Sequence, residues 1–82
     1  MLTCADRLAR ARANPRGVRF ADLCALATCH GWLFDRQAAS HRIYKRVGHA
    51  RLMNFQNHAG MAIPYQVRQL IRAIDAIKGE DP

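Results

Sequence analysis

A histidine lies among cations between residues 36 and 46, in the stretch Arg-Gln-Ala-Ala-Ser-His-Arg-Ile-Tyr-Lys-Arg. Histidine is the side chain that most readily both takes and gives a proton near neutral pH. Arginine and lysine beside it suit a substrate built of phosphates, because they neutralise its charge. The stretch is therefore compatible with acid–base chemistry on a phosphate-bearing substrate, although a lone histidine more often serves the structure. The candidate phosphate ligands within it are Arg36, Ser40, Arg42, Lys45 and Arg46.

The composition favours an anionic partner. Thirteen Lys and Arg against six Asp and Glu give a net charge of +7, and the pI is near 10.4. A field of that sign attracts nucleic acid, an acidic protein or a membrane surface, although solubility alone also accounts for a basic pI. A chain of 82 residues builds one small domain with a modest core. We therefore expect it to work on an exposed face and not inside a closed pocket.

The cysteines are odd in number, namely Cys4, Cys24 and Cys29, and no signal-peptide pattern precedes them. No stretch approaches the about 20 apolar residues of a membrane span. We expect a cytoplasmic protein with reduced thiols and no membrane contact. A zinc site from Cys24, Cys29 and histidines is disfavoured, because the close Cys-x-x-Cys pair of such sites is missing. No metal and no small-molecule cofactor is expected.

Two segments show the apolar periodicity of a core helix. The first spans residues 20–31, and the second spans 64–79 and begins at a proline, which suits the first helical position. A shorter helix rich in alanine and arginine precedes them, between a Thr-x-x-Asp cap at residue 3 and the Asn-Pro pair at residue 14. Its thin apolar content predicts weak docking on the domain, or a surface for a partner.

Three short strands are expected between the core helices, over residues 32–36, 40–47 and 51–56. Their connections are too short for parallel crossovers, so the pairing should be antiparallel. The sum is an α+β domain in which the sheet shows one face to the helices at 20–31 and 64–79. Alternation along the second strand places His41 and Tyr44 on opposite faces of the sheet. It does not settle which of the two faces is exposed to solvent.

Four motifs occur in a fixed order between residues 18 and 77. They are Val18-Arg19-Phe20 entering the first core helix, Gly31-Trp32 ending it, Arg36-Gln37-x-x-Ser40-His41-x-Ile43-Tyr44, and Pro64-Tyr65-Gln66-Val67-Arg68-Gln69. The ordered set resembles the HicA family of toxins from type II toxin–antitoxin systems. The Ser-His piece alone is weak, and the last motif makes the likeness far more specific.

The resemblance implies a fold like a double-stranded-RNA-binding domain, α-β-β-β-α. Residues 18–79 would form this HicA-like domain, residues 1–17 an N-terminal helical extension, and residues 80–82 a tail. The resemblance also implies an endoribonuclease (an mRNA interferase) that cleaves mRNA without a metal and arrests growth. Its implied protein partner is a HicB-type antitoxin that covers the active site.

The family's catalytic histidine, in a Gly-Ser-His motif, falls on His41. Ala39 stands where the family has glycine, which permits a positive φ or a close backbone approach. A methyl group is tolerated there if φ is negative. Arg68 is a further candidate for RNA binding, because the free amides at a helix N-terminus attract phosphate.

The expected reaction uses the nucleophile that RNA itself carries, the 2′-hydroxyl. His41 would take its proton, and the adjacent phosphate would become cyclic. The alternative is a non-catalytic module on the same fold that binds RNA or the antitoxin. The other histidines are expected to serve the structure, and so is Tyr44, for which stacking on a base is the alternative. Tyr65 is expected to contact RNA or the antitoxin, or simply to coat the surface.

Overall fold

A computed structural model describes residues 2–80 of the chain. The elements follow in the order α1 (Cys4–Ala13), the 3₁₀ turn η1 (Pro15–Gly17), α2 (Phe20–Cys29), β1 (Leu33–Ala38), β2 (His41–Arg46), β3 (His49–Gln56) and α3 (Pro64–Glu80). The three strands form one antiparallel sheet in the order β1-β2-β3. The predicted α+β class and element order are confirmed. Residues 81–82 of the expected tail lie outside the described residues, and Glu80 still belongs to α3.

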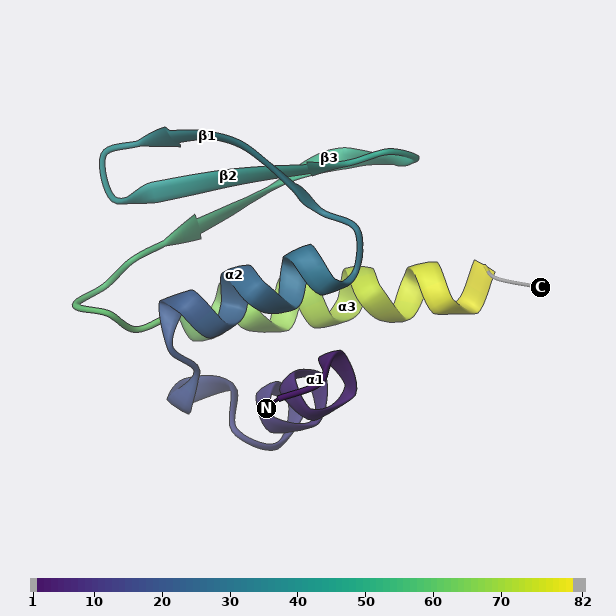
Figure 1. Cartoon of the computed structure of the whole chain (residues 1–82), viewed down its shortest axis with the longest axis horizontal. Helices are drawn as coiled ribbons and strands as arrows, with labels where there is room; N and C mark the ends of the chain where they lie inside the picture. The colour runs from purple at the N-terminus through teal and green to yellow at the C-terminus, as the bar shows by residue number, and fades with distance from the viewer. Residues whose placement is uncertain (1, 81–82) are drawn as a thin grey trace.

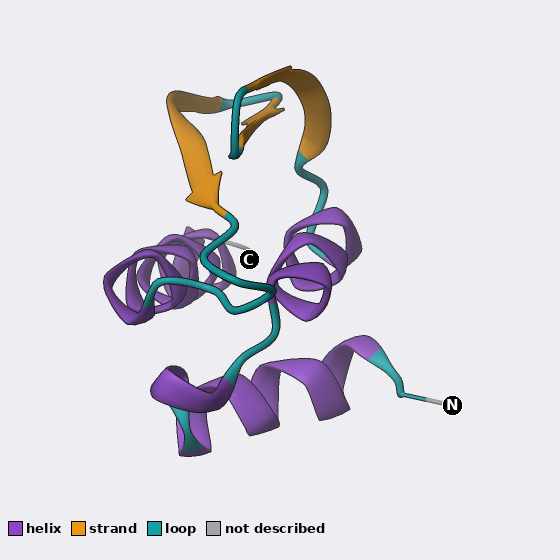
Figure 2. Ribbon diagram, turned by 90° about the vertical axis from the view of Figure 1, so that its left-hand side faces the viewer, coloured by secondary structure: helices purple, strands orange, loops and turns teal. Residues whose placement is uncertain are grey.

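The elements stack in layers. The sheet lies on one side of α2 and α3, and α1 lies on the other side of these two helices (Figure 1). Seen from the side, the strands again cover the helix pair from above while α1 runs beneath it (Figure 2). Within residues 2–80, the face of the sheet that points away from α2 and α3 is therefore left uncovered; we call it the open face.

The core lies between the sheet and the helix pair. Its largest fully buried side chains come from α2, from the connection between α2 and β1, from the sheet and from α3; they are Trp32, Phe55, Leu23, Leu26, Met53, Leu70, Ile74 and Val67. α2 is almost wholly apolar because it is covered on two sides, by the sheet and by α1. α3 is amphipathic, with charged residues on the side that the other layers leave exposed.

α1 docks more firmly than its thin apolar content predicts. Its capping box is formed as expected, with the Thr3 and Asp6 side chains and backbones bonded reciprocally. Leu8 and Ala11 are 7% and 2% exposed and belong to the main core. The small apolar face of α1 is sufficient for docking, because it packs against the side of α2 and α3 that the sheet leaves uncovered.

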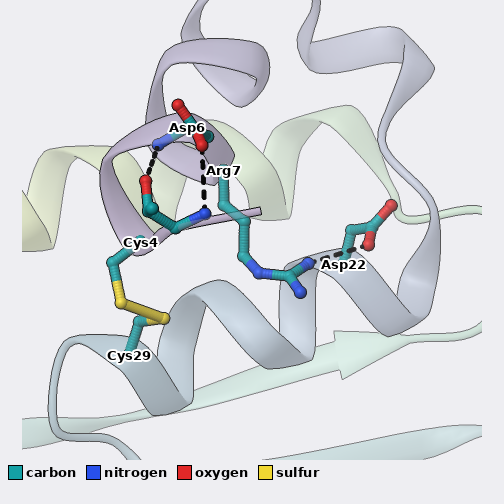
Figure 3. The surroundings of a disulfide bond; sticks show 6 residues. Cys4, Asp6, Arg7, Asp22 and Cys29 are labelled. Carbon is teal, nitrogen blue, oxygen red and sulfur yellow. Dashed lines mark hydrogen bonds and ion pairs between the residues drawn. A yellow bond between two sulfur atoms is a disulfide. The ribbon is translucent and has the colours of Figure 1, made fainter. Parts of the chain in front are cut away.

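Polar and covalent links add to this docking. Arg7 forms a 3.0 Å ion pair with Asp22 of α2, as Figure 3 shows. Arg12 pairs with Asp75 of α3 through both guanidinium nitrogens. Each arginine therefore fastens α1 to a different helix of the middle layer.

Cys4 and Cys29 are joined by a disulfide between the start of α1 and the end of α2 (Figure 3). The expectation of reduced thiols is wrong for these two residues. The two cysteines are 25 residues apart, so the sequence alone does not indicate that they pair. Only the crossing of α1 over α2 brings the two sulfurs within bonding distance. Cys24 is free and buried, as expected of a small core residue.

The strand ends differ from the expected ones by a few residues. β1 continues to Ala38, so the connection to β2 is a tight turn of Ala39 and Ser40. β3 begins at His49, two residues before the predicted start at residue 51. β1 also carries a bulge between Phe34 and Arg36, and no simple alternation in the sequence marks it.

Candidate active site on the open face of the sheet

His41 is the first residue of β2 and is half-buried. Its Cα partners are Ala38 on β1 and Gln56 on β3. Its ring nitrogen Nδ1 lies 2.8 Å from Oδ1 of Asn54, which lies on β3 diagonally across the sheet. The His41 side chain is thus fixed by a contact from β3 as well as by its own position on β2.

This hydrogen bond selects one form of the neutral imidazole. The amide oxygen of Asn54 can only accept, so Nδ1 of His41 donates and carries the proton. In the neutral ring, Nε2 is then the nitrogen with the free lone pair. A histidine in this form is ready to act as a base through Nε2.

Ile43 marks the middle of the open face. Its Cα partners are Arg36 on β1 and Asn54 on β3, and paired residues share a face of the sheet. Ile43 is only 9% exposed although no helix covers it, because its neighbours shield it. Arg36 is a diagonal neighbour of His41, a relation that places side chains about 7–8 Å apart in antiparallel sheets.

Asp35 holds the two cations of the open face. It forms an ion pair with Arg36 next to it, and its other oxygen lies 3.5 Å from Nζ of Lys45. One carboxylate therefore serves two cations, and the group keeps a net positive charge. Arg36 and Lys45 remain more than half exposed, so a phosphate can reach them.

Two other predicted ligands lie on the opposite face. The guanidinium of Arg42 stacks on Phe34, 4.6 Å from the ring centre, and lies 5.9 Å from the centre of the Tyr44 ring. Arg46 donates from Nε to the carbonyl oxygen of His30 at 2.8 Å. Arg46 thereby closes the end of α2, and the structure does not bring these two arginines to His41.

Ser40 and Arg68 have different positions. Ser40 is exposed in the turn directly before His41. Arg68 is exposed on α3, where it lines a hollow together with Arg12 and Pro15 of the α1 side. Ser40 therefore belongs with His41, and Arg68 belongs to another surface of the molecule.

Ala39 has a φ of +53°, in the left-handed region. This is the conformation that the family's glycine would permit, and the methyl group of an alanine makes it strained by about 1–2 kcal/mol. The carbonyl oxygen of Ala39 also accepts a hydrogen bond from Nε2 of Gln37 at 3.3 Å. The tight turn before His41 is thus formed despite the alanine.

Tyr44 is a core residue. It is 3% exposed, and its ring contacts the rings of Phe34 and Phe55. Burial raises the pKa of Tyr44 to about 12, with a hydrogen bond to Cys24 adding to the shift. It is therefore not available to stack on a base. Tyr65, by contrast, is 64% exposed at the start of α3.

Sequence reasoning missed Asn54, although its signal was present. Residues 52–56 alternate between exposed Leu52 and Asn54 and buried Met53 and Phe55. That alternation assigns Asn54 to the open face, but only the β2–β3 register sets it within reach of His41.

Among residues 2–80, no group of three or more His, Cys, Asp or Glu side chains gathers as a metal site would require. No helix in the described part of the chain is long and apolar enough to cross a membrane. Comparisons of the chain with protein-family models, with curated proteins and with solved structures found no match.

Proposed function

We propose that the protein is an endoribonuclease of the HicA type, an mRNA interferase with His41 as its general base. The observation that carries the proposal is the 2.8 Å hydrogen bond from His41 Nδ1 to Asn54, on an uncovered face of the sheet. It leaves Nε2 as the basic nitrogen where a large substrate can approach. The order of α2, the three strands and α3 is that of a double-stranded-RNA-binding domain, and we include this fold in the proposal.

In the proposed reaction, His41 Nε2 removes the proton from a ribose 2′-hydroxyl. The 2′-oxygen forms a bond to the adjacent phosphorus while the bond from phosphorus to the 5′-oxygen breaks. Water gives the leaving oxygen its proton. The products are a 2′,3′-cyclic phosphate and a free 5′-hydroxyl. Proton transfer by a placed base contributes about 10²–10⁴-fold to such a rate.

The cations of the open face would hold the phosphate. Arg36 and Lys45 share Asp35, so each has spare donors for a phosphate oxygen. Ser40 offers a hydroxyl from the turn before the base. The positions of Arg42 and Arg46 limit them to supporting roles, through stacking on Phe34 and the bond to the His30 carbonyl.

A HicB-type antitoxin is the proposed protein partner. Leu33 and Leu52 are 56% and 45% exposed, and Leu33 is paired with Lys45 on β2. Apolar side chains beside cations give a partner both area to bury and charges to match. In the cytoplasm, which we include in the proposal, reduction of Cys4 and Cys29 would leave α1 held by its apolar contacts and ion pairs.

The test compares wild type with His41→Gln on an RNA oligonucleotide and on the same oligonucleotide with a 2′-deoxyribose at the cleaved position. We expect His41→Gln to lower the cleavage rate by about 10²–10⁴-fold and the 2′-deoxy substrate to resist cleavage. His58→Gln, at an exposed position after β3, is the matched control and should cleave like wild type. Cleavage of the 2′-deoxy substrate would rule out the mechanism, and RNA binding without cleavage by wild type would favour the non-catalytic module.

A further inference from the structure

A groove runs between the edge strand β3 and helix α3. Its volume is about 320 Å³, and its lining residues are His49, Arg51, Met53, Tyr65, Gln69, Arg72 and Ala73. None of these residues carries a negative charge. The groove is separate from the open face, which lies on the other side of the sheet's edge.

Tyr65 stands at one end of the groove on the first turn of α3. Its side chain is 64% exposed, and it has no aromatic neighbour among the described residues. A tyrosine this exposed gives little to the core. It does offer a free ring face, which is what an unpaired nucleobase stacks on.

The groove's arginines are free of acidic partners. Arg51 and Arg72 form no ion pair with any described residue, whereas Arg7 and Arg12 are each paired. The nearest acid along α3 from Arg72 is Asp75, and it is bound by Arg12. Unpaired guanidiniums beside an exposed ring match the alternating phosphates and bases of a single strand.

The groove is connected to the candidate active site through the end of β3. Gln56 is the Cα partner of His41, and its backbone N–H donates to Oε1 of Gln66 at 2.8 Å. Gln66 is the residue after Tyr65. A nucleic-acid single strand bound in the groove therefore reaches the paired residues His41 and Gln56 after it crosses the edge strand β3.

We propose that this groove binds a single-stranded segment of the RNA next to the cleaved bond, with a base stacked on Tyr65 and phosphates on Arg51 and Arg72. The proposal rests on the proposed function and assigns its substrate a second contact surface. A single strand is favoured over a duplex, because a paired base cannot offer its face to Tyr65. RNA is favoured over a protein partner, because the groove combines cations and an aromatic ring with few exposed aliphatic side chains.

The test measures the affinity of the full chain for a single-stranded oligonucleotide with a 2′-deoxyribose at the cleaved position, so that cleavage does not enter. We expect Tyr65→Ala to weaken binding about 5- to 100-fold and Tyr65→Phe to bind like wild type, since phenylalanine keeps the stacking face. Arg72→Gln should reduce the slope of log affinity against log salt by about one, because one phosphate contact is lost. Arg16→Gln, an exposed arginine of η1, is the matched control and should leave both quantities unchanged.

Polyglutamate serves as a second probe that carries charge without bases. Tyr65→Ala should not change its affinity, and an equal loss for both probes would overturn the proposal. Oligonucleotide binding that is unaffected by Tyr65→Ala and Arg72→Gln would also overturn it. Loss of cleavage in His41→Gln would then still stand, so failure of the groove and failure of the active site are distinguishable.

Discussion

The α1 layer and the sheet use acidic residues in different ways. Around α1, Asp22 and Asp75 each bind one arginine, and Asp6 closes the helix cap. On the sheet, Asp35 alone serves both Arg36 and Lys45. Around α1, Arg7 and Arg12 each bind one acid and hold the helix in place, while on the sheet two cations share one acid and a positive charge remains.

This difference shows where a net charge of +7 becomes useful. Asp22 and Asp75 lie where α1 joins the helix pair, whereas no acidic residue lines the groove beside β3. The cations of the open face therefore outnumber the one acid beside them, and the arginines of the groove have no acid beside them.

The largest expected effect is on the α1 layer. Cys4→Ser removes a disulfide that closes a loop of 25 residues, and loops of that size give about 3 kcal/mol of stability. We expect urea unfolding to show this loss, and a reductant to lower wild type to the level of the variant. Oligonucleotide affinity should stay unchanged. A matching loss of affinity in the folded variant would mean that the two regions are not independent.

Asn54 tests the open face alone. Asn54→Leu removes the acceptor for His41 Nδ1, and one hydrogen bond of about 1 kcal/mol corresponds to a rate loss of about 5- to 10-fold. Asn54→Asp keeps an acceptor and should retain the tautomer. The ¹⁵N chemical shifts of the His41 ring report the tautomer directly. An unchanged tautomer in Asn54→Leu would remove Asn54 from this role.

Two alanines with positive φ make a matched pair. Ala39→Gly should stabilise the protein by about 0.5–1 kcal/mol, because glycine accepts a φ of +53° without steric cost. Ala59→Gly, at a φ of +51° in the turn before α3, should give a similar gain in thermal unfolding. Only Ala39 adjoins the candidate active site. A change in cleavage rate should therefore follow Ala39→Gly and not Ala59→Gly.

The smallest expected effect depends on pH. Burial lowers the pKa of His30 below 6.5, and the charges of Lys78 and Arg46 add to the shift. The folded state then favours neutral His30, so the unfolded chain binds the proton more readily. Stability from this source is present above pH 6.5 and is lost as the pH falls through the lowered pKa. His30→Gln should flatten that part of the unfolding profile, and an unchanged profile would contradict the assignment.

Much of the fold could be read from local signals. The proline that starts α3, the cap at Thr3 and the apolar periodicity of α2 each act within one or two turns of chain, so residues near in sequence suffice to predict them. The cations around His41 are likewise apparent from the sequence, whereas its catalytic role is implied by the resemblance and stays a proposal. The structure agrees with these elements to within a few residues at the strand ends.

The features that could not be predicted depend on contacts between distant segments. The Cys4–Cys29 disulfide requires the crossing of two helices, and the His41–Asn54 bond requires the β2–β3 register. Arg46 looked like a phosphate ligand because of its neighbours, yet it reaches the carbonyl of His30, 16 residues earlier. The neighbours of a residue in the sequence show that charged side chains cluster there, but they do not show which group each charged side chain binds.

The bulge in β1 has a consequence for self-association. β1 is an edge strand, and an open strand edge is a template on which a second copy of a chain can extend the sheet. The bulge between Phe34 and Arg36 interrupts the regular ladder there, and charged Asp35 and Arg36 lie at the interruption. The irregularity that sets Arg36 opposite Ile43 thus also disfavours the pairing of a second copy along the β1 edge.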